Sequence, residues 1–189
     1  EIGIEFLTLY AFSTENWNRP KLEVDTLMKL LISSLKKELD TLQKNNIRLN
    51  CIGNLEHLPE KVKKELLSVI EKTKNNTRMT LSLALSYGSR EELLNVVKKI
   101  SDKVKNNIIS LDAIDESIIN QHLYTHNLPD VDLVIRTSGE HRISNFLLWQ
   151  IAYAEFYFTD VLWPDFKEKD LYDAIISYQK RERRFGKTS

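Results

Sequence analysis

Polar and charged side chains gather at places in the sequence that follow short apolar runs. The first is Ser13 to Pro20, which follows Phe6 to Ala11 and combines hydroxyl and amide groups with a cation and an indole. Ser, Thr and Asn favour helix caps, so a capping loop is one interpretation of this segment. Trp17 and Arg19 are not needed for a cap, which leaves a ligand site as the other interpretation.

The second place is Arg136 to Asn145, directly after the apolar run Val131 to Ile135. Its two arginines offer planar, charge-assisted donors to a phosphate, and Gly139 lets the backbone approach an anion closely. His141 could bind a metal or move a proton. A solvated loop with salt bridges is the alternative. We favour a phosphate site, because open α/β sheets bind ligands beyond the carboxyl ends of their strands.

Two further signals lie toward the C-terminus. Glu155 stands in the apolar run Ala152 to Phe158, where a carboxylate is unusual unless it is paired or binds a metal. Its oxygens would suit Mg²⁺, which takes few protein carboxylates together with substrate phosphates. An exposed edge position or an arginine partner would explain the residue equally. The cations in Arg181 to Gly186 are a weaker signal, since cations near a helix C-terminus are favourable in any case.

Composition excludes several classes of function. The 189 residues contain 27 Lys and Arg and 27 Asp and Glu, so no overall basic field exists to hold nucleic acid. Cys51 is the one cysteine, which excludes an intrachain disulfide and a cysteine-rich metal site; a small buried side chain is the preferred interpretation. No apolar run reaches the roughly 18 residues of a membrane span, and no signal peptide is visible, so we expect a cytoplasmic protein.

Strand and helix patterns alternate along the chain, which predicts an α/β fold with a mainly parallel sheet and helices on both faces. The helix after Ser89 is expected to begin with a capping box at Ser89 to Glu92 and to bury Leu93, Val97, Ile100 and Val104. The expected strands are Phe6 to Ala11, Ile47 to Ile52, Met79 to Leu85, Val131 to Ile135 and Glu155 to Phe158. The other expected helices run between Leu22 and Leu42, from Pro59, from Asp115 to Leu123, and from about Lys167 to Arg184, with a buried helix turn at Phe146 to Ile151.

Known enzyme motifs are missing from this pattern. The sequence has no G-x-x-x-x-G-K-[ST], G-x-G-x-x-G, H-E-x-x-H or G-x-S-x-G segment. The sequence therefore lacks the usual motifs of nucleotide hydrolysis, zinc proteolysis and α/β-hydrolase chemistry.

Two long ordered segments resemble those of cis-prenyltransferases of the undecaprenyl diphosphate synthase type. Leu9 to Pro20 resembles the Y-A-F-S-x-E-N-W-x-R-P signature, and Asp132 to Phe146 resembles the D-L-x-I-R-T-[SG]-G-E-x-R-x-S-N-F block. Further matches cover essentially the whole chain, at Leu147 to Gln150, Tyr153 to Glu155, Phe158 to Asp160, Leu162 to Phe166 and Arg181 to Gly186.

The resemblance implies roles for individual residues and an apolar tunnel for the growing chain. Arg136, Arg142 and Ser144 match residues that bind the diphosphate of isopentenyl diphosphate. Glu155 matches a Mg²⁺-associated carboxylate, with His141 near the metal. Ser13 and Asn16 match polar residues of the family's catalytic loop, and Trp17 matches its mobile aromatic. Phe12, Arg19 and Glu23 match residues of the substrate site. Arg184 to Gly186 resembles an R-x-G element that reaches an active site across the dimer interface.

One departure from the family concerns the N-terminus. The family begins with a strand and an M-D-G-N-G-R-W loop, followed by an R-x-x-G-H-x-x-G segment, and this sequence opens at Glu1-Ile2-Gly3 without them. We therefore expect a single cis-prenyltransferase domain over residues 1–189 that lacks the N-terminal strand and phosphate-binding loop. As it stands, the sequence is expected to give little or no turnover.

The function implied by the resemblance is elongation of farnesyl diphosphate with isopentenyl diphosphate, with Mg²⁺ as cofactor. The product would be long-chain cis-polyprenyl (undecaprenyl) diphosphate, the precursor of the lipid carrier in cell-wall synthesis. A homodimer without nucleic acid and a peripheral membrane contact for product release are also implied. Two rivals remain, a non-catalytic partner subunit and a truncated form that binds a phosphate ligand without reaction. Retention of Arg136, Arg142, Ser144 and Glu155 argues against a purely structural subunit.

Overall fold

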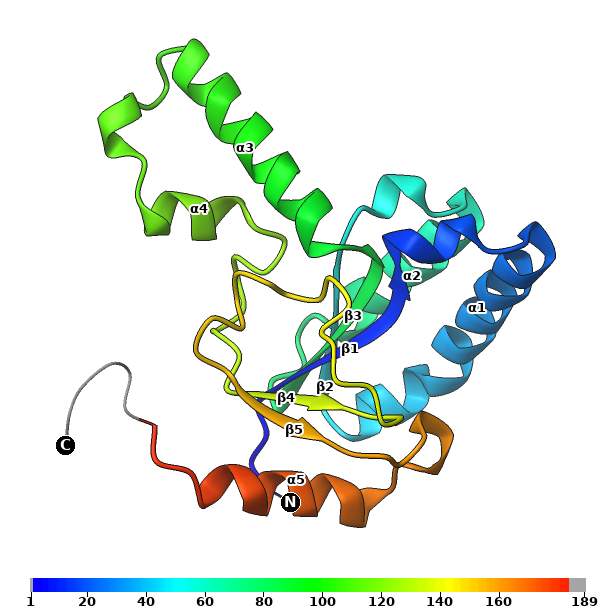
Figure 1. The fold of residues 1–189 in the computed structure, drawn as a ribbon. Coiled ribbons are helices and arrows are strands. Elements are labelled where there is room, and N and C mark those ends of the chain that lie inside the picture. Colours follow the sequence, from blue (N-terminus) through cyan, green and yellow to red (C-terminus); the bar gives the residue numbers. More distant parts are fainter. Residues whose placement is uncertain (1, 184–189) are drawn as a thin grey trace. The chain divides into compact units, whose positions relative to one another are not determined.

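The computed structural model describes residues 2–183, and its contacts divide the chain after Leu128 into two compact units. Each unit combines parallel strands with helices, so the predicted α/β class is confirmed (Figure 1). The single domain over residues 1–189, the helices on both faces of one sheet and the apolar tunnel stay predictions.

Unit 1, which ends at Leu128, contains a parallel three-stranded sheet in the order β1-β3-β2. Its strands are β1 (Phe6–Ser13), β2 (Ile47–Ile52) and β3 (Met79–Tyr87), close to their predicted bounds. β1 and β3 both extend beyond the predicted ends at their carboxyl sides, where Ser13 pairs with Tyr87. The polar segment after β1 and the last residues of the central β3 therefore lie at the same edge of the sheet.

Helices α1 (Lys21–Lys44) and α2 (Glu60–Thr73) pack against each other and against β2. Pro20 and Pro59 directly precede them, as suits a residue whose φ is fixed near the helical value. The predicted stripes of both helices contribute to the core of unit 1, and Leu66 and Val62 are almost completely buried.

Helix α3 (Ser89–Lys105) begins at the predicted residue but is not capped as predicted. Its N-cap is Gly88, and no side chain bonds to the cap. Glu92, the expected partner in a capping box, is only 1% exposed and accepts hydrogen bonds from Tyr87 Oη at 2.6 Å and Tyr124 N at 2.7 Å. Because this buried carboxylate binds tertiary partners, the local capping pattern was misleading here.

The predicted apolar stripe of α3 is also partly wrong. Ile100 is buried, but Val97 is 60% exposed and Val96 is buried in its place. Leu93 and Val104 are partly buried, so Val97 is the one member of the predicted stripe that is exposed. Helix α4 (Glu116–His122) is confirmed, with Asp115 as the N-cap that accepts from Ile118 N at 2.8 Å.

Unit 2 contains a parallel pair, β4 (Leu133–Arg136) and β5 (Glu155–Phe158), and helix α5 (Glu168–Gln179), which contacts β5. β4 begins two residues later than predicted. Between the strands, the predicted buried helix turn at Phe146 to Ile151 is a series of turns in which Leu147 and Ile151 are buried. The last helix ends at Gln179 rather than near Arg184, which lies outside the described residues.

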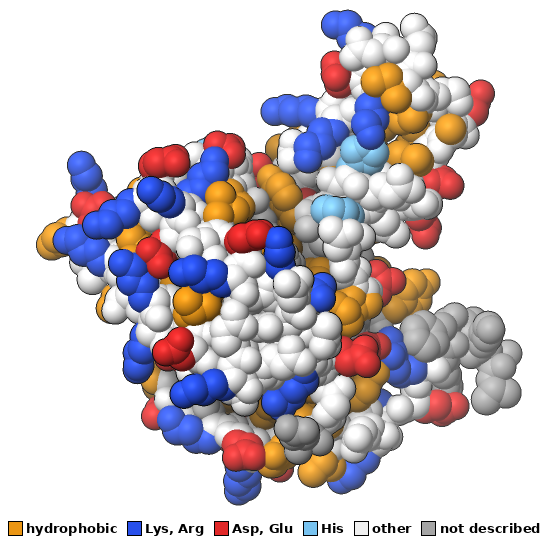
Figure 2. All heavy atoms as spheres, turned by 180° about the vertical axis from the view of Figure 1, so that it is seen from behind, with side chains coloured by type: hydrophobic (Ala, Val, Ile, Leu, Met, Phe, Trp, Pro, Cys, Tyr) orange, Lys and Arg blue, Asp and Glu red, His pale blue; other side chains and the backbone are white. Residues whose placement is uncertain are grey.

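The surface carries no large area of one charge on the face that Figure 2 shows. Lysine and arginine side chains lie interspersed with aspartate and glutamate side chains over this face. This mixture agrees with the formal net charge of zero. In the described part of the chain, no helix combines the length and the apolar character that a membrane crossing requires.

The end of β2 approaches β3 so closely that only glycine fits at position 53. A Cβ at Gly53 would lie 2.1 Å from the carbonyl oxygen of Leu85, and its φ of +119° disfavours other residues. We predict that Gly53→Ala lowers the free energy of unfolding by about 2 kcal/mol or more. Urea denaturation followed by circular dichroism measures this loss.

Gly3→Ala is the matched control. Gly3 also has a positive φ, +72°, but a Cβ there would have no neighbour within 4 Å. Its replacement should therefore cost only the backbone term, about 1 kcal/mol. Equal losses from the two variants would contradict the close approach of β2 and β3.

Candidate functional site

The segment after β1 forms a short 3-10 helix, η1 (Thr14–Asn18), and it does contain a cap. Ser13 N donates to Asn16 Oδ1 at 2.9 Å. The capping interpretation of Ser13 and Asn16 is therefore correct. Their proposed catalytic roles stay predictions.

Trp17 is held by two contacts that a cap does not require. Its indole Nε1 donates to Ser86 Oγ at 2.9 Å, and its ring meets the ring of Phe12 edge to face at 4.8 Å between centroids. Phe12 is 3% exposed and Ser86 is fully buried. The structure thus brings Phe12 and Trp17 together and fixes the indole against Ser86 near the carboxyl end of β3.

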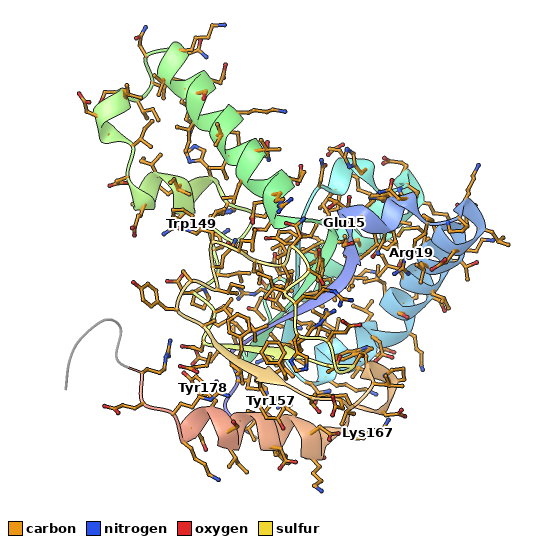
Figure 3. The ribbon with its side chains drawn as sticks, in the orientation of Figure 1. Glu15, Arg19, Trp149, Tyr157, Lys167 and Tyr178 are labelled. Atoms are coloured by element: carbon orange, nitrogen blue, oxygen red, sulfur yellow. The ribbon has the colours of Figure 1, made fainter. Side chains whose placement is uncertain are left out.

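Arg19 and Glu23 form an ion pair at the start of α1, with 2.9 Å between Arg19 Nη1 and Glu23 Oε1. Both side chains are 48% exposed, so the pair contributes little to stability. Figure 3 shows Arg19 on the segment that leads from η1 into α1, with Glu15 on η1. The guanidinium is accessible to an anionic ligand that competes with Glu23.

In unit 2, Arg136 is the last residue of β4 and opens the predicted phosphate loop. Among the described residues its buried Nε atom has no hydrogen-bond partner. A buried guanidinium nitrogen without a partner is costly, and an oxyanion would supply the missing acceptor. This atom is the strongest structural sign of an anion site in the loop.

The backbone of this loop departs repeatedly from ordinary conformations. Its left-handed residues other than glycine are Ser138, Ser144, Asn145 and Leu147, with φ between 50° and 70°. Gly139, with a φ of 66°, donates its N–H to Thr159 O at 3.0 Å. Such conformations cost free energy and gather at ligand-binding sites, so they support a functional interpretation of the loop.

His141 and Arg142 lie in different surroundings. The imidazole ring of His141 packs against the ring of Phe158, with 5.1 Å between centroids. Arg142 pairs with Glu140 on the surface, where its side chain is 66% exposed. The salt-bridge alternative from the sequence is therefore present for Arg142, in a pair that an incoming diphosphate could replace.

Glu155 lies apart from Arg136 in unit 2. In the parallel register, Leu133 pairs with Glu155 and Arg136 pairs with Phe158. The two residues are thus at opposite ends of a pair of four-residue strands, about 10 Å apart along the strand direction. Because side chains alternate between faces, Glu155 also points to the face opposite Arg136, Phe158 and the His141 ring.

The partner of Glu155 is an arginine, as one alternative from the sequence proposed. Arg181 Nη1 lies 2.7 Å from Glu155 Oε2. Nearby, Arg183 Nη1 lies 2.6 Å from Asp132 Oδ1 and donates to Tyr178 Oη at 2.8 Å. In Figure 3, Tyr178 lies on α5 and Tyr157 on β5, the two elements that this cluster connects.

The predicted metal ligands do not form a metal site by themselves. Over residues 2–183, no group of three or more His, Cys, Asp and Glu side chains could hold a metal ion. The His141 ring packs against Phe158, and Glu155 pairs with Arg181. Their joint role at a metal ion stays a prediction.

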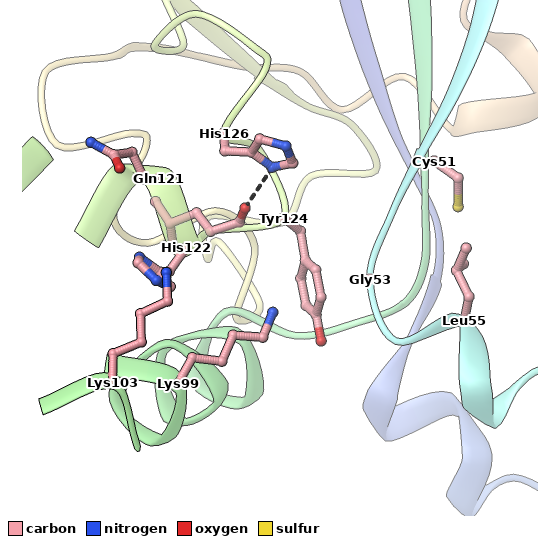
Figure 4. A pocket seen from close by; sticks show the side chains of 10 residues that line it. Cys51, Gly53, Leu55, Lys99, Lys103, Gln121, His122, Tyr124 and His126 are labelled. Carbon is pink, nitrogen blue, oxygen red and sulfur yellow. Dashed lines mark hydrogen bonds between the residues drawn. The ribbon is translucent and has the colours of Figure 1, made fainter. Parts of the chain in front are cut away.

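A cavity of about 370 Å³ lies elsewhere, in unit 1, lined by residues of β2, α3 and α4 and their loops (Figure 4). Lys99, Lys103 and His122 line it, but none of the predicted site residues does. Cys51 also lines it, and burial raises the pKa of its thiol to about 12. The thiol therefore stays protonated near neutral pH, and Cys51 is partly rather than fully buried.

Sequence reasoning missed Ser86, the acceptor for Trp17. Ser86 and Tyr87 follow the predicted strand Met79 to Leu85 directly, at a carboxyl end of the sheet. The same strand-end argument that selected the other two polar segments would have selected this one. Asp132 had no comparable signal, and Arg181 belonged only to the weaker cationic signal at Arg181 to Gly186. Their pairings depend on how the chain returns after α5.

Comparison with known proteins places the chain in a family. The family model described as "Putative undecaprenyl diphosphate synthase" matches residues 1–186. An isoprenyl transferase of Clostridium perfringens is 52% identical over 186 residues, which are 98% of this chain and 74% of that protein. A (2E,6E)-farnesyl-diphosphate-specific ditrans,polycis-undecaprenyl-diphosphate synthase of Pasteurella multocida is 50% identical, over 98% of this chain and 78% of that protein.

Solved structures agree with these matches. Lavandulyl diphosphate synthase from Lavandula x intermedia, in complex with dimethylallyl diphosphate, has a TM-score of 0.94 at 41% identity, covering 98% of this chain and 80% of that one. A probable undecaprenyl diphosphate synthase from Campylobacter jejuni has a TM-score of 0.85 at 40% identity, covering 97% and 84%. The chain belongs to the undecaprenyl diphosphate synthase family of prenyltransferases.

Proposed function

We propose that this protein elongates farnesyl diphosphate with isopentenyl diphosphate to give a long-chain cis-polyprenyl diphosphate. The carbon–oxygen bond at C1 of the allylic substrate breaks, and C1 bonds to C4 of the isopentenyl unit. A proton then leaves that unit, and a cis double bond forms. The partnerless buried Nε of Arg136 in a strained loop after β4 is the observation that supports an oxyanion ligand most directly.

On the isopentenyl side, we assign diphosphate binding to Arg136, Arg142 and Ser144. Arg136 would offer its buried nitrogen, and Arg142 would exchange its surface partner Glu140 for the diphosphate. Fixing the diphosphate orients the alkene carbon, which is a proximity contribution to the rate. His141 lies on the same face of the strand pair as Arg136 and would add a donor there.

On the allylic side, we assign Phe12, Ser13, Asn16, Trp17, Arg19 and Glu23. Trp17 offers a half-buried aromatic surface that the buried Phe12 ring supports, and Arg19 offers a cation that Glu23 holds in place. A cation and an aromatic surface on neighbouring residues suit an allylic diphosphate, which has a charged head and an apolar tail.

Prenyltransferases of this family need a divalent metal ion, and we propose Mg²⁺. When bound, the ion would neutralise charge that develops on the departing diphosphate. Glu155 is retained as the proposed metal-associated carboxylate, although it is paired with Arg181 here. His141 is proposed to lie near this ion.

The rival of a non-catalytic partner subunit is not favoured, because similar proteins at about 50% identity are named as synthases and transferases. We further propose a homodimer in the cytoplasm that contacts the membrane peripherally when product leaves. These proposals rest on the resemblance to the family alone.

Incubation with labelled isopentenyl diphosphate tests the proposed reaction. The full natural chain with farnesyl diphosphate and Mg²⁺ should give isoprenoids longer than the acceptor, and excess EDTA should abolish them. Dimethylallyl diphosphate is the comparison acceptor, since a structural relative holds it; we expect it to be used less well. Binding of both substrates without any longer product would contradict the proposal.

Arg142→Lys tests the diphosphate assignment. Lysine keeps the charge but loses the planar fork, so we predict that KM for isopentenyl diphosphate rises about tenfold or more. The KM for the allylic diphosphate should change much less. Steady-state kinetics with one substrate varied at a time measures both constants.

Arg48→Lys is the matched control. Arg48 is also an exposed arginine, but it lies at the amino end of β2 in unit 1 and bonds to the carbonyl of Asn76. This variant should leave both KM values near those of the parent. A similar rise in KM from both variants would refute a specific role for Arg142.

A further inference from the structure

The indole of Trp17 is attached to one buried hydroxyl group. Trp17 Nε1 donates to Ser86 Oγ at 2.9 Å, and this is a contact between residues 69 positions apart in the sequence. Ser86 is fully buried, whereas Trp17 is half-buried. Loss of the hydroxyl would leave the indole N–H without this acceptor.

Ser86 itself is held in a left-handed conformation, with a φ of 48°, near the end of a strand. This conformation costs free energy in a residue other than glycine, and it persists only where the surrounding structure fixes it. The carbonyl of Ser86 accepts from Asn54 N at 3.2 Å, and Gly53 beside it leaves no room for a Cβ against Leu85. The end of β2 therefore fixes the backbone that carries this hydroxyl.

The neighbouring Tyr87 is fixed from two further sides. Tyr10 Oη on β1 donates to Tyr87 O at 3.1 Å, and Tyr87 Oη donates to the buried Glu92 at 2.6 Å. Burial, and then the charge of Glu15, raise the pKa of Tyr10 to about 12, so its phenol remains a donor near neutral pH. β1, β2 and α3 thus all anchor the last two residues of β3.

We infer that Ser86 is a positioning residue for the proposed prenyl transfer: its hydroxyl holds Trp17, and thereby the turn with Ser13 and Asn16, in the orientation used for the allylic substrate. The inference deepens the proposed function and rests on it for its catalytic consequence. The hydrogen bond itself is a property of the free protein. Its existence and its catalytic effect are therefore measured separately.

The hydrogen bond is tested by NMR of the indole N–H groups. The chain has three tryptophans, so the Trp17 signal is assigned by its loss in Trp17→Phe. In Ser86→Ala we expect this signal to move upfield and to lose protection from solvent exchange. Alanine and serine are similarly disfavoured at positive φ, so the variant chiefly removes the acceptor.

Ser82→Ala is the matched control. Ser82 also lies on β3, is 1% exposed, and accepts a hydrogen bond, from Asn50 Nδ2 at 3.0 Å. This variant loses a buried acceptor of the same kind but does not touch Trp17, so the Trp17 signal should stay in place. An unchanged Trp17 signal in Ser86→Ala would overturn the inference, whatever the activity.

The catalytic effect is tested by a double-mutant cycle. Ser86→Ala should lower kcat/KM about tenfold in the parent but less than about twofold when Trp17 is already phenylalanine. Equal losses in both backgrounds would overturn the positioning role, because Ser86 would then act independently of Trp17. If the parent forms no isoprenoid longer than the acceptor, the proposed function fails. The NMR result still decides whether the hydrogen bond exists.

Discussion

The parallel pairing of β3 with both β1 and β2 is the constraint on which unit 1 depends. It brings three carboxyl ends to one edge of the sheet, where Gly53 lies against the carbonyl of Leu85. That close approach leaves Ser86 and Tyr87 at the centre of a set of hydrogen bonds from β1, β2 and α3. The aromatic side chain of Trp17 is positioned by this edge rather than by its own short helix.

Unit 2 has a shorter sheet than unit 1. A two-stranded parallel pair offers few backbone contacts, so its long connection from β4 to β5 carries much of the local structure in turns with positive φ. The same connection carries most of the residues that resemble a diphosphate site. A strained loop with a partnerless buried arginine nitrogen is stable only at a cost, which an oxyanion ligand would lower.

Much of the fold could be predicted from the sequence, because apolar periodicity and proline positions determine where elements begin. β2 and β5 have their predicted bounds, and Pro59 correctly indicated the start of α2. Tertiary contacts defeated the local signals at Glu92, which is buried between Tyr87 and Tyr124 instead of capping α3. In the candidate site, the two polar segments were found from strand ends, but the face on which Glu155 lies depends on strand register, which a sequence pattern does not specify.

The central claim is that the loop after β4 binds the diphosphate of isopentenyl diphosphate. A crystal structure of the full natural chain with that compound tests it most directly. We expect a diphosphate whose oxygens contact Arg136 Nε, the Arg142 guanidinium and the Ser144 hydroxyl. A diphosphate bound elsewhere, with Arg136 Nε still without an acceptor, would contradict it.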